Sequence, residues 1–474
     1  MAREAGATGR VLEGEVAASP PPSKTQRAAA PQGSFTRDAL QTYGTNVVNI
    51  GLSTAGGIVT ARMLGPYQRG IYSLVYLFAA TVVTFGKLGL AQANVYSIRR
   101  NGIPAERVAA NALIVALLLG SILALLAFLL RDWLLGTFLR GVPLWAFYIS
   151  LPLIPVLLFE SYFFAVVQAL GHFTLYNRRM LIGTATLVCG LFVFLLAVRG
   201  GLTAAILVIT INPIVMDTWL LVTVWRMLRF RLRLDRTLLA QEIRFGLKSH
   251  LQVVTQHLHL RADAYLVAYF LDPSQVAFYV LAAKFAELML DIPKSVGIVM
   301  YPRLAALDDA AMHELTAQAC RRTILITCTM GVIISLLGPV LIPLWYGAPY
   351  APAARPLPLI AAGIVMMSIL VLLTQSFTSR NRQQVNIIVG AVALGGNLGL
   401  NTLLIPRMGI VGAALSSTIS YAVAALLLII PFVRGSQLSA VDVLVPRMED
   451  VRFVVGVAVD ALRRARRAAF GAAR

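Results

Sequence analysis

Apolar stretches of about 20 residues recur along the whole chain, and they limit its possible folds more than any other feature. A helix needs about 20 residues to cross the hydrocarbon core of a bilayer. Hydrophobic residues occupy 58% of the 474 positions and charged residues only 13%, with a mean hydropathy of +0.76. Soluble domains contain about a quarter charged residues, so the sequence predicts an all-α polytopic membrane protein.

We expect about twelve transmembrane helices in two pseudo-symmetric six-helix bundles. The spans expected in the first bundle, residues 38–225, are 38–61, 71–93, 108–130, 145–167, 180–198 and 202–225. Those expected in the second bundle, residues 245–433, are 245–271, 276–300, 323–345, 356–378, 383–405 and 409–433. The remaining segments are a disordered cytoplasmic arm (1–37), a basic cytoplasmic linker (226–244) and a basic amphipathic cytoplasmic tail (434–474).

An internal repeat supports the division into two bundles. Residues 61–79 align without gaps to residues 268–286, with eight of nineteen positions identical. Leu151–Ile154 recurs as Leu357–Ile360 at nearly the same offset. Because six helices separate the copies, both cross the membrane in one direction and should be related by an axis along the membrane normal. Proteins built from such repeats often place a central site between their halves.

The net charge of +20 follows the expected topology. With the N-terminus placed inside, 29 of the 41 Lys and Arg residues fall in inside segments and seven in outside loops. Inside loops of membrane proteins have such an excess of basic residues, so we assign both termini to the cytoplasm and the chain to the inner membrane. Basic clusters also bind nucleic acid, but topology explains these charges and no nucleic-acid partner is expected.

Ionisable residues within the expected spans concentrate in the seventh and eighth. Four charged residues of span 276–300 are spaced by three, four and three positions, on one helical face: Lys284, Glu287, Asp291 and Lys294. Since a charge in lipid is costly, this face should line a bundle interior or a wet cavity. The stripe is either a self-neutralised ladder of ion pairs or a site for an anionic group with ion-coupling carboxylates. Pro293 should permit a kink.

The seventh span, 245–271, has two polar faces. One carries His250, His257 and Arg261, and the other carries Gln252, Gln256, His259 and Asp263. One face should line the cavity and the other should contact a neighbouring helix. The first span has a milder polar stripe that includes Asn46 and Asn49, and Asn49 aligns with Gln256 in the repeat. Such neutral groups suit sugar hydroxyls, and they suit helix packing equally well.

Other sequence features indicate little chemistry. There is no zinc-ligand spacing, phosphate-binding lysine loop or nucleophile elbow, so we predict no enzyme activity, no cofactor and no metal. Glu160, Asp217 and Lys87 are isolated, and each is either a cavity residue or the end of a span. The three cysteines are interpreted as packing residues. In the tail, Val451, Val455, Ala458 and Leu462 precede several arginines, which suits either an interfacial helix on anionic lipid or a flexible basic tail.

Several segments resemble the polysaccharide-exporting flippases of the multidrug/oligosaccharidyl-lipid/polysaccharide exporter (MOP) superfamily. They are Ala61–Leu74, Lys87–Leu90, Arg261–Tyr265, Tyr279–Ala282, Tyr301–Leu304, Trp345–Tyr350 and Asn397–Ala414. The resemblance covers about residues 38–434 and is most distinctive at its last segment. It implies two six-helix bundles in a V, alternating access to each side, a cationic central cavity and an ion gradient as the driving force. Family members often have fourteen helices, whereas twelve are expected here.

We therefore expect a non-enzymatic flippase for a polyprenyl-pyrophosphate-linked oligosaccharide. The substrate-binding cations would be Arg261, Lys284 and Lys294. Ion coupling or a salt-bridge switch would involve Asp263, Glu287 and Asp291. The polar cavity residues would be Asn46, Asn49, Gln256 and His257. The expected partners are the lipid-linked saccharide, membrane lipids and envelope-biosynthesis proteins that the tails would contact.

Other functions remain open from the sequence. A multidrug or cation antiporter of the same fold and a lipid II flippase are alternatives, although lipid II flippases usually have an arginine-rich first-helix region and this chain has no arginine there before Arg62. A glycosyltransferase or polymerase would need catalytic carboxylates in large outside loops, and the expected loops have only about 3–14 residues. A membrane scaffold would act only through residues 1–37 and 434–474.

Overall fold

The computed structural model describes residues 32–380 and 382–471, so most of the predicted N-terminal arm (1–37) lies outside the described residues. The helices of the first half are α1 (Gln32–Gly86), α2 (Leu90–Arg99), α3 (Ala105–Leu129), α4 (Arg131–Gly136), α5 (Leu144–Ser150), α6 (Leu153–Ala169), α7 (Phe173–Phe192) and α8 (Gly201–Leu228). Those of the second half are α9 (Arg236–Phe270), α10 (Pro273–Glu287), α11 (Asp291–Ala306), α12 (Asp309–Tyr346), α13 (Leu357–Ser379), α14 (Gln383–Met408), α15 (Ile410–Arg434), α16 (Ala440–Leu444) and α17 (Met448–Gly471).

The predicted all-α polytopic fold is confirmed. All regular elements of the described segments are helical, and nine of their helices are long and apolar enough to cross a membrane. Three further crossings bring the number to the expected twelve: the second part of α1, α9 and the α10–α11 pair. Charged residues lower the hydropathy of α9 and α10–α11, which explains why length and composition alone do not single them out.

The first two expected spans are joined without a loop. A single kinked helix, α1, covers the first span and the second as far as Gly86, and the remainder of the second span, residues 87–93, falls in a turn and in the start of α2. The only non-helical residue of α1 is Gly65, with φ of 68°. Glycine adopts this left-handed conformation without the steric cost that a Cβ would add, and the fixed φ of Pro66 suits the first turn of a new helix. The outside loop expected between 61 and 71 is therefore replaced by a one-residue kink, which the repeat aligns with the Asp272–Pro273 junction between α9 and α10.

The eighth expected span is interrupted. α10 ends at Glu287, a 3-10 turn follows at Leu288–Leu290, and α11 begins at Asp291. Pro293 has no backbone N–H and its ring clashes with the carbonyl of Met289 in a regular helix, which accounts for the interruption just before it. The stripe of four charged residues is thus divided, with Lys284 and Glu287 on α10 and Asp291 and Lys294 on α11.

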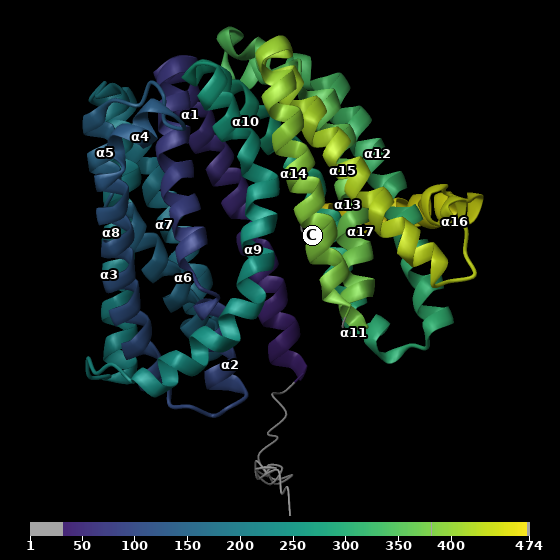
Figure 1. Ribbon diagram of the computed structural model, residues 1–474, viewed down its shortest axis with the longest axis horizontal. Helices are drawn as coiled ribbons and strands as arrows, with labels where there is room; N and C mark the ends of the chain where they lie inside the picture. The colour runs from purple at the N-terminus through teal and green to yellow at the C-terminus, as the bar shows by residue number, and fades with distance from the viewer. Residues whose placement is uncertain (1–31, 381, 472–474) are drawn as a thin grey trace, which may run out of the picture.

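The helices form two groups that meet at one end and diverge at the other, which confirms the expected V-shaped pair of bundles (Figure 1). α1, α9 and α10 lie between the groups, and α1 packs along α10. At the closed end, Arg62 donates hydrogen bonds to the carbonyl oxygens of Leu344 at 2.6 Å and Trp345 at 2.8 Å. The Tyr350 hydroxyl donates to the Ala61 carbonyl at 3.2 Å. Backbone acceptors therefore join the two halves at this end.

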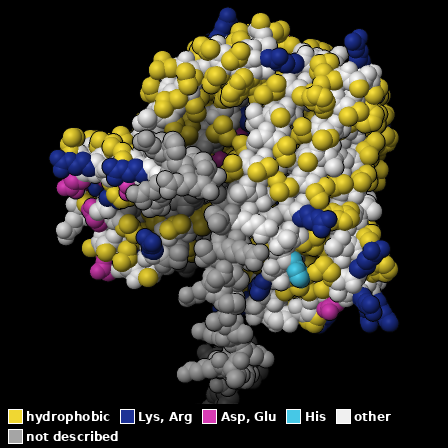
Figure 2. Space-filling view, turned by 180° about the vertical axis from the view of Figure 1, so that it is seen from behind, with side chains coloured by type: hydrophobic (Ala, Val, Ile, Leu, Met, Phe, Trp, Pro, Cys, Tyr) yellow, Lys and Arg dark blue, Asp and Glu magenta, His cyan; other side chains and the backbone are white. Residues whose placement is uncertain are grey.

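The outer surface is largely apolar, with basic side chains most frequent toward its edges and on a unit that projects from one lobe (Figure 2). Large side chains such as Leu118, Leu129, Leu336 and Val340 are more than half exposed on α3 and α12. In water, so many exposed apolar side chains would favour aggregation. In a bilayer they face acyl chains, so this surface fits a protein that crosses the membrane several times.

The two halves approach each other closely at Gly70. A Cβ built on Gly70 would lie 1.8 Å from the Pro273 carbonyl oxygen, well inside any real contact. α1 and the beginning of α10 can pack at this distance only because Gly70 has no side chain. The absence of a side chain at Gly70 therefore helps to close this end of the V.

We expect Gly70→Ala to separate α1 from α10 and to destabilise the closed end by about 1–3 kcal/mol, the usual cost of overpacking. The thermal unfolding midpoint of the purified protein in detergent should fall. Gly44→Ala is the matched control, because a Cβ at Gly44 meets nothing within 4 Å. Equal midpoints for the two variants would contradict this account of the closed end.

Candidate functional site

A cavity of about 1130 Å³ lies between the two halves. Its wall is formed by α1, α2, α6, α7 and α8 of the first half and by α9 and α10 of the second. Pockets for drug-sized ligands usually occupy about 300–1,000 Å³. The cavity is therefore large enough for a headgroup bigger than an ordinary small molecule.

The charged side chains that line the cavity are mostly basic. The basic residues are Arg69, Lys87, Arg179, Arg261 and Lys284, and the acidic residues are Glu160 and Glu287. A concave surface lined by one sign of charge between low-dielectric walls concentrates the opposite ion. The surplus of positive charge therefore favours an anionic group in this cavity.

Arg261 of α9 and Glu287 of α10 form a bidentate ion pair in the cavity wall. Nη1 lies 2.7 Å from Oε1, and Nη2 lies 3.1 Å from Oε2. The Arg261 side chain is still 33% exposed, so an incoming anion can reach it. Within the described residues Glu287 pairs with Arg261 and not with Lys284 one turn away. Glu287 therefore pairs with a residue of the neighbouring helix α9. One of the two interpretations from the sequence had instead expected ion pairs along the single span that contains Lys284 and Glu287.

Three other residues singled out in the sequence line the same cavity: Asn49 on α1, His257 on α9 and Lys284 on α10. His257 Nε2 lies 2.8 Å from Thr81 Oγ1 on α1, so this histidine bridges the two halves. Lys284 and Arg261 extend from adjacent helices of the second half. The structure thus brings the predicted Arg261, Lys284 and Glu287 into one cavity. Two of the four predicted polar cavity residues, Asn49 and His257, line it as well.

Four predicted site residues lie elsewhere. Asn46, Gln256, Asp291 and Lys294 are exposed, and the described cavity wall does not include them. The 3-10 turn at Leu288–Leu290 separates the last two from Lys284 and Glu287. A role in transport stays a prediction for these four side chains.

Asp263 lies behind the cavity, buried on the opposite face of α9, with only 2% of its surface exposed. The Tyr279 hydroxyl donates to Oδ2 at 2.8 Å, the Asn401 amide donates to Oδ1 at 2.6 Å, and Ser417 Oγ also donates to Oδ2. The Asn401 amide also donates to Asn397 Oδ1 at 3.0 Å. Three donors from α10, α14 and α15 thus converge on one carboxylate, which joins these helices to α9 in the second bundle.

Arg179 is a functional candidate that the sequence did not reveal, because the expected spans placed it at the end of an inside loop, residues 168–179. Its Nε donates to Asp217 Oδ1 at 3.0 Å, and its Nη2 lies 3.4 Å from Glu160 Oε1. The Arg179 and Asp217 side chains are 6% and 5% exposed. Glu160 and Asp217 lie within apolar spans, where a carboxylate needs a nearby cation. This need could have indicated that a basic residue such as Arg179 lies beside them.

Arg69 is a second candidate that was missed, because it was assigned to an outside loop. Arg69, Tyr72, Ser73 and Tyr76 all line the cavity on the second part of α1. The Arg69 guanidinium lies 4.7 Å from the centre of the Tyr72 ring, a cation–π contact. The four residues are spaced by three, one and three positions, so they share one face of the helix. This pattern of polar and aromatic residues could have indicated that the face lines the cavity.

A family model described as polysaccharide biosynthesis protein matches residues 59–355, well over half of the chain. The chain belongs to this polysaccharide biosynthesis family. The match confirms the family expected from the sequence. Among curated proteins, none is similar enough in sequence to count as a relative.

Solved structures show the same fold as this member of the polysaccharide biosynthesis family. The lipid II flippase MurJ, in an inward closed conformation, is similar with a TM-score of 0.72 and 14% identity, over 90% of this chain and 93% of that one. A multidrug resistance MATE family transporter of the MOP superfamily, inward-facing, gives 0.68 and 15%, over 81% and 93%. An outward-facing MATE structure gives 0.61 and 16%, over 85% and 94%. The chain is a multi-pass membrane protein with the MOP exporter fold.

Arg179→Ala should leave the buried Asp217 and the half-buried Glu160 without their cation, at a cost of about 3–5 kcal/mol. The thermal unfolding midpoint should fall sharply. Arg179→Ala with Asp217→Asn should recover part of the loss, because the second change removes one uncompensated charge. Arg178→Ala, at the exposed neighbouring position, should leave the midpoint unchanged. A midpoint for Arg179→Ala equal to that of Arg178→Ala would show that the ion pair contributes nothing.

Proposed function

We propose that the protein flips an oligosaccharide, linked to polyprenyl pyrophosphate, across the cytoplasmic membrane for polysaccharide export. The observation that carries the proposal is the cationic cavity between the halves, with five basic and two acidic residues in its lining. A pyrophosphate is strongly anionic, and arginine and lysine are its usual protein partners. Membership of the polysaccharide biosynthesis family supports a saccharide as the rest of the substrate.

Arg261 and Lys284 are the proposed headgroup-binding cations. Both line the cavity from the second half, while Arg69, Lys87 and Arg179 face it from the first half. A headgroup held between them would contact both lobes at once. The Arg261–Glu287 pair would act as a salt-bridge switch, because an incoming phosphate competes with Glu287 for the same guanidinium.

The saccharide would occupy the neutral part of the same lining. Asn49, Ser53, Tyr76 and Gln92 provide hydroxyl and amide groups there. These groups both donate and accept hydrogen bonds, as sugar hydroxyls require. The apolar polyprenyl chain would remain among the acyl chains of the bilayer outside the lobes.

Alternating access is the proposed mode of transport. The closed end is held by Arg62 and Tyr350 and by the close approach of Gly70 to Pro273, while the lobes diverge at the other end. The excess of basic residues supports placing the diverging end and both termini in the cytoplasm. This state would therefore accept a substrate from the inner leaflet.

Asp263 is the proposed ion-coupling residue. It is buried on α9, the helix that also carries Arg261, and it is held by donors on α10, α14 and α15. Binding or loss of a cation at this carboxylate would change how these helices pack. Because Asp263 and Arg261 are two residues apart on α9, such a change would reach the headgroup site.

The antiporter of the same fold is less well supported. A carrier for cationic drugs needs a cavity of negative charge, and here the basic lining residues outnumber the acidic ones. A lipid II flippase would share the pyrophosphate headgroup, so the cationic lining does not separate it from our proposal. Comparison of lipid-linked oligosaccharide and lipid II as substrates in the same liposomes distinguishes the two.

Replacing both Arg261 and Lys284 with alanine should reduce translocation to the protein-free rate, because the headgroup loses both cations of the second half. Purified protein in liposomes that contain a fluorescent lipid-linked oligosaccharide provides the measurement. The matched control is Arg355→Ala with Arg407→Ala, which removes two exposed charges outside the cavity lining. Translocation at the wild-type rate by the Arg261/Lys284 variant would exclude the proposed site.

Asp263→Asn keeps the shape of the side chain and removes its charge. We expect translocation to lose its stimulation by an imposed proton or sodium gradient, while binding of the lipid-linked oligosaccharide persists. Separate proton and sodium gradients across the liposome membrane identify the ion. Ser417→Ala, which removes one donor and leaves the carboxylate, should retain part of the stimulation. Full gradient stimulation in Asp263→Asn would refute ion coupling at this residue.

A further inference from the structure

The chain continues beyond the last spanning helix into α16 and α17, which project from the second lobe beside α12 (Figures 1 and 2). α12 carries its last charges at Arg321 and Arg322, and its sequence from Thr323 to Tyr346 has none. The boundary between a charged and an uncharged stretch of a spanning helix marks the membrane surface. The α16–α17 unit is attached to α12 at this boundary.

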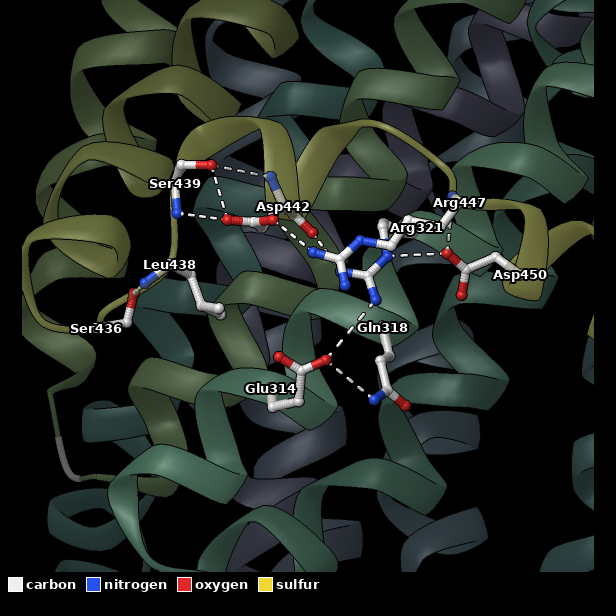
Figure 3. A network of polar contacts seen from close by, with 9 residues as sticks. All are labelled: Glu314, Gln318, Arg321, Ser436, Leu438, Ser439, Asp442, Arg447 and Asp450. Atoms are coloured by element: carbon white, nitrogen blue, oxygen red, sulfur yellow. Dashed lines mark hydrogen bonds and ion pairs between the residues drawn. The ribbon is translucent and has the colours of Figure 1, made fainter.

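A buried polar network holds the unit there (Figure 3). Arg321 Nε donates to Asp450 Oδ2 at 2.8 Å, and Arg321 Nη1 donates to the Asp442 carbonyl oxygen. Arg322 Nε donates to the other Asp450 oxygen at 3.1 Å. The Arg321 and Asp450 side chains are 3% and 2% exposed. Breaking a buried ion pair of this kind is costly, so the first turn of α17 has a fixed position on α12.

The ionised form of Asp450 is favoured in this position. Burial alone would raise the pKa of Asp450, but the Arg447 backbone N–H and the guanidinium groups of Arg321 and Arg322 together lower it below its ordinary value. The ion pair is therefore present at neutral pH. α16 begins with a capping box at Ser439, in which the Asp442 side chain accepts a hydrogen bond from the Ser439 backbone N–H at 2.9 Å. This capping box stabilises the first turn of α16.

The docked helix leaves an apolar face without cover from the described residues. Met448, Val455 and Val459 are spaced by seven and four residues, so they share one side of α17. Met448 is 70% exposed and Val455 is 55% exposed. This side is turned away from Asp450, which faces α12. Of the predicted tail stripe, Val451 and Val455 are described, and the side chains of Ala458 and Leu462 lie outside the described residues.

Basic residues border this apolar face. Arg452 lies four residues after Met448, and Arg463 lies four residues after Val459, so both are at its edge. The acidic residues Glu449 and Asp460 lie farther round the helix, on its polar side, and the exposed Asp460 Oδ1 lies 3.8 Å from Arg463 Nη1. α16 adds two exposed valines, Val441 and Val445. An apolar face with arginines at its edge matches a bilayer surface, where acyl chains lie beside anionic phosphates.

From this geometry we infer that α17 is a membrane-surface helix, clamped to α12 by Asp450, whose Met448–Val455–Val459 face enters the leaflet and whose Arg452 and Arg463 bind anionic phospholipid headgroups. The clamp would keep the start of α12 at a fixed depth while the lobes move. The inference does not depend on the substrate proposed above.

Site-directed spin labelling of the full-length protein tests this inference. Single labels are placed at Val455→Cys and, on the polar side, at Glu449→Cys, in a background without the native cysteines. The protein is reconstituted in nanodiscs of phosphatidylcholine, with or without phosphatidylglycerol. Accessibility to oxygen and to a water-soluble nickel complex then reports the depth of each label. At Val455, oxygen should exceed the nickel complex several-fold in the anionic nanodiscs, and at Glu449 the order should be reversed.

Charge reversal supplies the second measurement. Arg452→Glu with Arg463→Glu should shift the label at Val455 toward water in anionic nanodiscs. Arg231→Glu with Arg233→Glu, the same change at two exposed positions of the linker, should not move it. A label at Val455 that stays accessible to the nickel complex in anionic nanodiscs would overturn the inference. Dipolar broadening between labels would do so too, because it would assign the apolar face to a second copy of the chain.

Discussion

The cost of placing an ionised side chain in hydrocarbon shapes this structure throughout. α9 and α10 carry the charged residues Arg261, Asp263, Lys284 and Glu287, and these two helices lie between the lobes, where none of these charges has to face lipid. The more apolar helices α3 and α12 expose leucine and valine on the outside. The cavity is thus where a chain of this composition can accommodate its charges.

Much of the fold could be predicted from the sequence because the bilayer imposes a length on each helix. Spans expected at 202–225, 356–378, 383–405 and 409–433 correspond to α8, α13, α14 and α15, with ends that differ by at most three residues. The two differences have local causes. Gly65 joins two spans into the kinked α1, and Pro293 divides one span into α10 and α11, because each residue changes the backbone and leaves the hydropathy almost untouched.

The residues that line the cavity were harder to predict than the helices. The spacing of polar residues shows which face of a helix they share, but it does not show which other helix packs against that face. The spacing on α9 placed Arg261 and His257 on one side and Asp263 on the other, as they lie in the structure. The partners of these residues come from distant segments: Glu287, Thr81 and Asn401. Arg69 and Arg179 were missed because boundary estimates assigned them to loops, and an error of a few residues at a helix end moves a side chain from solvent into the cavity.

The kink at Gly65 has a mechanical consequence. Arg62 precedes it and binds the backbone of α12, whereas Arg69 follows it and faces the cavity, so a single bend connects the closed end of the V to the cavity. A backbone conformation that only glycine adopts easily gives α1 a pivot at this point. A displacement of Arg69 on one side of this pivot would therefore shift Arg62 on the other side, as in a lever, because both side chains belong to the same helix.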